Sequence, residues 1–346
     1  MAVEMGLFGL FRRTDGALLF TLKNKNGMEV QLTNLGAIIV KLLVPDKKGK
    51  LADVVLGFDD CKEYLKNKSF FGAVIGPSAN RIGNASYKID GVEYRAIDND
   101  KSNNLHSDFY DGYHKRLWAT KLGENSVTFM LDDEDGRMGF PGTKRISITY
   151  TLTDDNALEL HYHASSDKKT ILNLTNHTYF NLDGHDAGNI EDHELQLNCS
   201  NYTPVVKGAI PTGEIAPVAG TVMDFTKAKK VGKDINENFQ QLKLTKGYDH
   251  NWVIDGWDGK LREFARVKGP KSGRVMTCYT TLPGVQFYAG NCIATQTGKN
   301  GVVYGKRSGL CLETQYYPDT VNHKNFPSCI FGGKKEYDSV TVYKFS

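Results

Sequence analysis

Residues 146–163 read ISITYTLTDDNALELHYH, and this stretch decides the fold class. Apolar and polar residues alternate over residues 146–152 and again over residues 158–163, with a polar turn at residues 154–156 between them. A repeat of two residues sends successive side chains to opposite faces of a strand. The stretch therefore predicts a two-stranded antiparallel hairpin with one solvent-exposed face.

The same alternation recurs along the rest of the chain. It is seen at residues 127–131, 194–198, 274–279 and 340–345, and Asp-Gly turn signals at positions 111, 135, 183, 255 and 258 lie between such runs. Short helices are expected only around residues 59–67 and 236–242. No Gly/Ser-rich or Pro-rich linker divides the 346 residues. We therefore predict an all-β protein, a large antiparallel β-sandwich with few short helices, forming one domain over residues 1–346.

Composition narrows the partners and the compartment. The 43 Lys and Arg against 40 Asp and Glu leave a net charge of +3. The electrostatic field of so small a charge is too weak to attract nucleic acid or an acidic membrane. The six cysteines form no C-x-x-C pair, which favours reduced thiols. Residues 1–13 lack the basic start of a signal peptide, and no run of 18 apolar residues occurs. We expect a cytoplasmic protein, a monomer or homodimer, with no nucleic-acid or membrane partner.

Two residues in polar segments are candidates for acid–base chemistry. Glu313 follows residues 310–312, Leu-Cys-Leu, so it is expected at the edge of a buried strand, where burial raises the pKa of a carboxyl toward that of a general base. His177 lies among asparagines and aromatic residues, and an imidazole there can exchange a proton near neutral pH. A salt-bridged glutamate and a purely structural histidine are the alternatives.

Other polar residues indicate the kind of ligand. Arg81 beside Asn80 offers forked donors next to an amide, and aromatic residues interleaved with such groups are typical of a pocket for a neutral sugar. His161 and His163 share a strand face, but no further ligand motif completes a metal site, so a solvent-exposed face is expected there. Of the neighbours Asp249 and His250, only one is expected to reach a pocket. Phosphate-loop, dinucleotide and serine-elbow motifs are absent from the sequence.

Several motifs in a fixed order resemble the aldose 1-epimerase, or galactose mutarotase, family from about residue 33 to the end of the chain. They are ANRI at residues 79–82, NLTNHTYFNL at 173–182, YDHN at 248–251, PGVQFY at 283–288 and LETQ at 312–315. This resemblance implies a galactose mutarotase-like supersandwich with a sugar cleft on one face. It also implies a small-molecule aldose as substrate and no metal or organic cofactor.

The resemblance also implies roles for individual residues. Glu313 corresponds to the catalytic base and His177 to the catalytic acid, which we expect to act as an imidazolium. The implied substrate-binding residues are Asn80, Arg81, His106, Asp249 and Gln286.

The chain departs from the family's usual pattern at three places. Pro77 stands where an arginine is usual, Ser107 and Asp108 stand where two glycines are usual, and Tyr316–Tyr317 replaces the usual pair after LETQ. Loss of glycine beside His106 is expected to narrow or reshape the sugar site.

The resulting functional hypothesis is an isomerase that interconverts the α and β anomers of free aldohexoses such as galactose and glucose. Ring opening and reclosure by acid–base catalysis would require one ionised carboxylate and one protonated histidine. The alternatives are a hexose-6-phosphate 1-epimerase, a glycosidase with two carboxylates, and a carbohydrate-binding module without catalysis.

Overall fold

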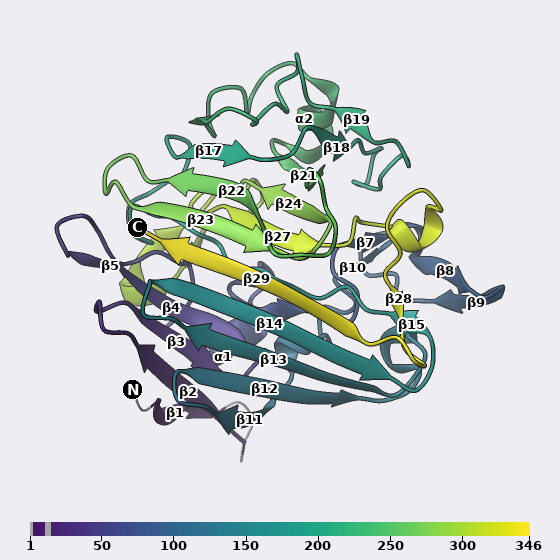
Figure 1. Cartoon of the computed structure of the whole chain (residues 1–346), viewed down its shortest axis with the longest axis horizontal. Helices are drawn as coiled ribbons and strands as arrows, with labels where there is room; N and C mark the ends of the chain where they lie inside the picture. The colour runs from purple at the N-terminus through teal and green to yellow at the C-terminus, as the bar shows by residue number, and fades with distance from the viewer. Residues whose placement is uncertain (1–2, 11–14) are drawn as a thin grey trace.

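The computed structural model describes residues 3–10 and 15–346, and its regular structure is mainly antiparallel strands (Figure 1). In this part of the chain the largest sheet has nine strands, in the order β11-β12-β13-β14-β29-β23-β22-β17-β20. Their bounds are β11 (Ala119–Leu122), β12 (Ser126–Asp133), β13 (Lys144–Leu152), β14 (Ala157–Ser166), β29 (Tyr337–Phe345), β23 (Val275–Thr280), β22 (Arg262–Lys268), β17 (Glu194–Leu197) and β20 (Lys229–Lys230). In Figure 1 this sheet faces the viewer, with β12 near the bottom and β17 near the top.

Two further sheets lie behind the nine-stranded sheet in the view of Figure 1. One has the order β19 (Ala216–Pro217), β18 (Asn201–Thr203), β21 (Asp249–Val253), β24 (Gly284–Tyr288) and β27 (Cys311–Gln315). The other has the order β1 (Glu4–Leu10), β2 (Gly16–Lys23), β3 (Glu29–Thr33), β4 (Ile38–Pro45) and β5 (Leu51–Asp53).

Short antiparallel pairs and single helical turns make up the rest of the regular structure. The pairs are β7 (Arg81–Ile82) with β10 (Asn104–Leu105), β6 (Val74–Ile75) with β16 (Thr175–Asn176), β8 (Ser86–Ile89) with β9 (Val92–Arg95), β15 (Thr170–Ile171) with β28 (Ile330–Phe331), and β25 (Gln296–Thr297) with β26 (Val303–Tyr304). The α-helices are α1 (Cys61–Lys66) and α2 (Gln240–Thr245), and the 3₁₀ turns are η1 (Gly83–Ala85), η2 (Tyr113–Lys115), η3 (Arg137–Gly139), η4 (Lys299–Gly301) and η5 (Thr320–Asn322).

The predicted hairpin is confirmed as β13 and β14. These strands pair antiparallel with Thr149 opposite His161, and the buried positions alternate along both strands. The chain reverses at Asn156, whose φ of 63° lies in the left-handed region that asparagine tolerates well. Period-2 patterning therefore gave both the strands and the face that is buried.

Side chains from the two rear sheets pack against the nine-stranded sheet. Phe20 of β2 meets Phe129 of β12 edge to face, with ring centroids 5.7 Å apart. The Tyr150 hydroxyl donates to the backbone carbonyl of Ala37 over 2.7 Å. On β27, the Thr314 hydroxyl lies 2.6 Å from that of Thr341 on β29. Facing sheets with an interdigitated core form a β-sandwich, as predicted. That residues 1–346 constitute one domain stays a prediction.

The solvent-exposed face predicted at His161 and His163 is confirmed. His161 Nε2 lies 2.9 Å from the Asp338 carboxylate, and His163 Nε2 lies 3.1 Å from that of Glu336. The four side chains are between 43% and 65% exposed. Each imidazole thus has its own carboxylate partner on a wet strand face.

Both expected helices occur, although α2 begins at Gln240, later than the start predicted at residue 236. The signal-peptide prediction for residues 1–13 includes residues 1–2 and 11–13, which lie outside the described residues, and it stays a prediction. None of the helices among the described residues has the length and apolarity needed to cross a bilayer.

Replacing Phe129 by alanine tests the sandwich core. Phe129 is fully buried between the rings of Phe20 and Tyr150, so Phe129→Ala is expected to lower the free energy of unfolding by about 3–5 kcal/mol. Met130→Ala, at an exposed position on the same strand, is the control and should change it by less than about 0.5 kcal/mol. Urea denaturation measures both. Equal effects of the two substitutions would contradict this packing.

Candidate active site

Three neighbouring strands, β21, β24 and β27, bring the central residues of the candidate site together. Asn251 lies opposite Gln286, and Gln286 lies opposite Glu313. Residues two apart on a strand share a face, so Asp249 and Tyr288 lie on the same side as this row. Sheet register thus places polar groups from three distant parts of the sequence side by side.

Glu313 occupies the middle of β27, in a strand whose residues are all buried. The prediction that it lies at the edge of a buried strand is therefore wrong, because both faces of β27 are covered and the strand continues past Glu313 to Gln315. Only 2% of Glu313 is exposed, and its Oε2 has no hydrogen-bond partner among the described residues. An unpaired buried carboxylate oxygen costs free energy, so it is available to a ligand hydroxyl.

His177 follows β16 and is held by its backbone and by ring stacking. Its N–H donates to the Ala73 carbonyl over 2.8 Å, and its carbonyl accepts from Gly72 N–H over 3.0 Å. The imidazole lies between the rings of Tyr179, 5.0 Å away, and Phe70, 5.6 Å away, nearly parallel to both. These contacts fix the plane of the imidazole.

The two nitrogens of the His177 ring have different neighbours. Nε2 lies 3.7 Å from Glu313 Oε1, and Nδ1 lies 3.4 Å from the Cys311 sulfur. Burial raises the pKa of the Cys311 thiol well above its usual value, so the sulfur stays protonated and uncharged. A thiol is a weak hydrogen-bond donor and a weak acceptor. The Cys311 thiol can therefore accept from a protonated Nδ1 or donate to an unprotonated one.

Arg81, Asn80 and His106 meet at the short β7–β10 pair. The Arg81 guanidinium donates from Nε to the Asp100 carboxylate over 2.9 Å. Asn80 N–H donates to His106 Nδ1 over 3.1 Å, and the Asn80 side-chain amide donates to Gln315 Oε1 over 3.4 Å. Because Nδ1 is an acceptor here, the neutral His106 ring carries its proton on Nε2.

Asp249 and His250 point to opposite sides of β21, as predicted. Asp249 accepts a hydrogen bond from the Gln286 amide over 2.7 Å on the side of Glu313. His250 is fully buried, with Nε2 3.2 Å from Gln241 Oε1, and it contacts the ring of Trp252. Only Asp249 is therefore available to a ligand.

Burial favours the uncharged forms of Glu313, His177 and Asp249. It raises the pKa of Glu313 well above its usual value, with Asp249 adding to the rise and Arg81 opposing it. It lowers the pKa of His177 to about 3 and raises that of Asp249. Desolvation therefore favours a neutral His177 ring at pH 7, and the imidazolium expected during the reaction stays a prediction.

All seven residues predicted for the site line one pocket of about 200 Å³. They are Asn80, Arg81, His106, His177, Asp249, Gln286 and Glu313. The pocket therefore contains a second carboxylate, that of Asp249, which the sequence reasoning treated only as a hydroxyl ligand.

Seven further residues that sequence reasoning did not assign to the site line the same pocket. They are Lys68, Ser69, Phe70, Leu105, Tyr179, Tyr288 and Cys292. Tyr179 and Tyr288 belong to the family motifs. Their place in the sequence, two residues from His177 and Gln286, could have indicated that they line the pocket. Phe70 follows α1 in a segment with no motif and could be found only from the structure.

His106, His177 and Glu313 each present one ligand atom within 4.8 Å of the others, a spacing that can hold a metal ion. The donor set does not fit a metal well. His106 Nδ1 accepts from a backbone N–H, so its Nε2 bears a proton instead of a free lone pair. A donor N–H beside an acceptor carboxylate suits sugar hydroxyls instead.

The residues that depart from the family pattern lie outside the pocket lining. The Ser107 hydroxyl accepts from Ser78 N–H over 2.9 Å, and Asp108 accepts from Tyr110 N–H over 2.6 Å. Ser107 adopts a φ of 66°, a left-handed conformation that glycine would adopt without strain. The Ser107 side chain thus binds the backbone of Ser78, and that of Asp108 stabilises its own loop. Neither lines the pocket, and the expected narrowing or reshaping of the sugar site stays a prediction. Pro77, Tyr316 and Tyr317 are likewise absent from the lining.

Comparison with known proteins matches this fold and pocket to a family. The family model described as aldose 1-epimerase matches residues 18–344. Galactose mutarotase of Homo sapiens is 44% identical over 321 residues, covering 92% of this chain and 91% of the human protein. Galactose mutarotase of Mus musculus is 43% identical and covers 100% of this chain and 99% of the mouse protein.

A solved structure agrees with these sequence matches. The crystal structure of an aldose epimerase homologue from C. elegans superposes with a TM-score of 0.87 at 31% identity, covering 95% of this chain and 98% of that chain. Since the matches cover nearly the whole length on both sides, the chain belongs to the aldose 1-epimerase family.

Proposed function

We propose that this enzyme interconverts the α and β anomers of free aldohexoses such as galactose and glucose. The observation that carries the proposal is the Glu313–His177 pair, whose Oε1 and Nε2 atoms lie 3.7 Å apart at a pocket lined by hydroxyl-binding groups. The names of the human and mouse relatives, both galactose mutarotases, support it.

Ring opening and reclosure need one base and one acid that exchange roles. Glu313 would remove the proton of the C1 hydroxyl while His177 donates from Nε2 to the ring oxygen O5. The open aldehyde then rotates about C1–C2 and closes on its other face, with both proton transfers reversed. Positioning of both groups against one sugar supplies the rate enhancement.

The pair can hold one proton in two arrangements. Burial places that proton on Glu313, as a neutral acid beside a neutral imidazole. Moving it to His177 Nε2 produces the carboxylate and the imidazolium that the reaction needs. Sugar hydroxyls donating to Glu313, together with the Arg81 charge, would stabilise the carboxylate form in the occupied pocket.

The remaining polar residues would orient the pyranose. His106 Nε2–H, the Arg81 guanidinium and the Gln286 amide are donors, and Asp249 is an acceptor. Asn80 acts beside them and connects His106 to Gln315. Together, these forked groups and the His106 imidazole can match several hydroxyls of a neutral sugar at once.

We further propose that the enzyme works in cytoplasmic carbohydrate metabolism, as a monomer or homodimer with a free sugar as its partner. All six cysteines are free thiols and five of them are buried, which fits a reducing compartment. The small net charge of +3 fits an uncharged substrate.

Two alternative functions predict different results in activity and binding assays. A hexose-6-phosphate 1-epimerase would turn over glucose 6-phosphate and leave free glucose unchanged, and a carbohydrate-binding module would bind galactose calorimetrically without mutarotation. Polarimetry over a panel of α-aldoses, with and without 6-phosphate, separates both from the proposed activity.

Substituting the acid–base pair should nearly abolish mutarotation. Glu313→Gln and His177→Asn each remove one proton-transfer group and should lower kcat by about 10²–10⁴. The matched controls are Glu336→Gln and His163→Asn, which alter a Glu–His pair on the exposed strand face. Polarimetry measures all four variants. Near-wild-type rates in either pocket variant would refute the assignment.

The pH profile of kcat/KM should be bell-shaped, with its acid limb far below the usual pKa of histidine. Only the pair with a single shared proton is active, and a second proton binds only as the pH falls toward the His177 pKa of about 3. On the alkaline side, activity falls as Glu313 loses the shared proton at its raised pKa. Initial rates should therefore not fall as the pH is lowered from 7 to 5. A tenfold fall following a pKa near 6.5 would contradict this.

Gln286→Ala tests the binding group opposite Glu313. The substitution removes the amide that donates to Asp249 and is expected to raise KM about tenfold while changing kcat less. Gln196→Ala, at a strand position outside the pocket, is the control. Initial rates over a range of galactose concentrations separate KM from kcat, and an unchanged KM would remove Gln286 from the binding set.

A further inference from the structure

The Cys311 thiol lies beside His177, and the proposed reaction assigns it no part. Its sulfur is hydrogen-bonded to Nδ1 of the His177 ring over 3.4 Å. Cys311 is fully buried on β27, two residues before Glu313, so both side chains lie on the same face of the strand. The strand therefore presents a sulfur to one nitrogen of the His177 ring and a carboxyl to the other.

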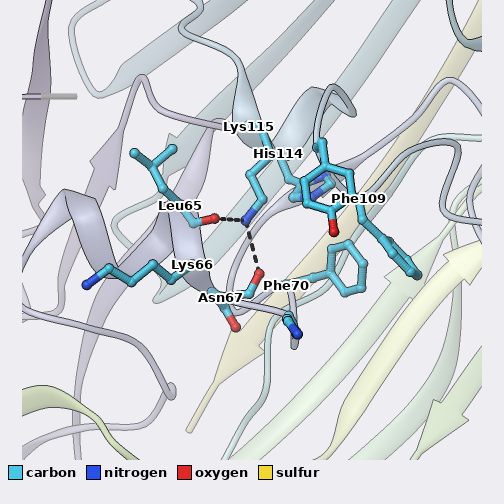
Figure 2. A pocket seen from close by; sticks show the side chains of 9 residues that line it. Leu65, Lys66, Asn67, Phe70, Phe109, His114 and Lys115 are labelled. Carbon is cyan, nitrogen blue, oxygen red and sulfur yellow. Dashed lines mark hydrogen bonds between the residues drawn. The ribbon is translucent and has the colours of Figure 1, made fainter. Parts of the chain in front are cut away.

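Stacked rings keep the His177 imidazole in the plane that gives each nitrogen its neighbour. The ring of Tyr179 is tilted from it by 19° and that of Phe70 by 20°. Figure 2 shows Phe70 beside Phe109 and His114, with which it lines a neighbouring pocket of about 460 Å³. Its ring lies 5.8 Å from that of Phe109 and 4.7 Å from that of His114. A flip of the imidazole would therefore require packed aromatic rings to move.

The proposed proton transfer needs one particular tautomer of the neutral His177 ring. The proton that Glu313 holds can move to Nε2 only if Nε2 carries no proton beforehand. A neutral imidazole has a single N–H, so the ring proton must then be on Nδ1. A buried N–H needs an acceptor, and the Cys311 sulfur is the side-chain atom hydrogen-bonded to Nδ1.

The main chain of His177 favours the same tautomer. Burial lowers the pKa of the ring to about 3, and a hydrogen bond to the residue's own backbone partly opposes this lowering. A backbone group that favours the protonated ring must be the carbonyl, because only an acceptor gains from a ring N–H. Nδ1 is the ring nitrogen closer to the main chain, so this carbonyl also favours a proton on Nδ1.

A thiol suits this position because it stays neutral and is only a weak donor. Burial raises the pKa of Cys311 well above its usual value, and the nearby Glu313 adds to the rise. The sulfur lone pairs can accept from Nδ1–H, while the S–H competes weakly as a donor to the same nitrogen. The bond also persists when His177 becomes an imidazolium, because Nδ1 keeps its proton.

We propose that Cys311 is a positioning residue that keeps the ring proton of His177 on Nδ1, so that Nε2 is free to receive the shared proton from Glu313. This inference rests on the proposed mutarotase function and adds a residue to it. Cys311 is absent from the lining of the catalytic pocket, so its effect reaches the sugar through His177.

NMR spectroscopy of the wild-type enzyme reads the tautomer directly. In protein labelled with ¹⁵N-histidine, long-range ¹H–¹⁵N correlations distinguish protonated from unprotonated ring nitrogens, and the signals of His177 are those lost in His177→Asn. At pH 7 without sugar, the ring is expected to be neutral, with a protonated Nδ1 and an unprotonated Nε2. A proton on Nε2 instead of Nδ1 would overturn the proposal.

Replacing the thiol tests its effect on the reaction. Cys311→Ala removes the acceptor and is expected to lower kcat for galactose by about threefold to tenfold, with a smaller change in KM. It should also raise the share of His177 that carries its proton on Nε2. The matched control is Cys278→Ala, which removes an equally buried thiol from β23 and should alter neither kcat nor the tautomer. Polarimetry gives the rates and NMR the tautomer.

Two results with the variants would overturn the proposal. One is an unchanged tautomer or an unchanged kcat in Cys311→Ala. The other is an equal fall of kcat in Cys278→Ala, because the thiol would then act by packing alone. Wild-type enzyme that leaves every aldose unchanged would instead refute the mutarotase function, and the tautomer of His177 would still be measured by NMR.

Discussion

Burial of the Glu313 carboxyl against the His177 ring is the constraint on which the rest of the site depends. A carboxyl in the middle of a fully buried strand is costly unless neighbouring groups share its proton. His177 can do so only because Tyr179, Phe70 and Cys311 hold its ring with Nε2 toward Glu313. The rings of Tyr179 and Phe70 and the Cys311 thiol are therefore as necessary for the acid–base chemistry as the two titrating groups.

The β-sandwich makes this arrangement possible because both faces of β27 are covered. Thr314, the residue after Glu313, faces Thr341 in the core, while Glu313 itself faces the pocket. Strand alternation thus lets one short segment serve the core and the site. Ordered strands also hold these groups before a ligand arrives, which reduces the entropy cost of binding.

Much of this could be predicted from the sequence. Alternation in residues 146–163 gave the hairpin, its buried face and the fold class, because a two-residue period has a single structural interpretation. The family resemblance predicted seven of the fourteen residues that line the pocket. Sequence could not give the protonation state of His177, since that depends on burial by segments distant in the chain. Phe70 escaped prediction for the same reason, and Glu313 was placed at a strand edge because local pattern does not show that both faces are covered.

The ring of Phe70 lies within 4.7–5.6 Å of three imidazoles, those of His106, His114 and His177. An aromatic ring current shifts the NMR resonances of nearby protons according to their position. The Phe70 ring is therefore expected to shift the NMR signals of three of the nine histidines. Occupancy of the catalytic pocket can be followed through these signals without any added probe.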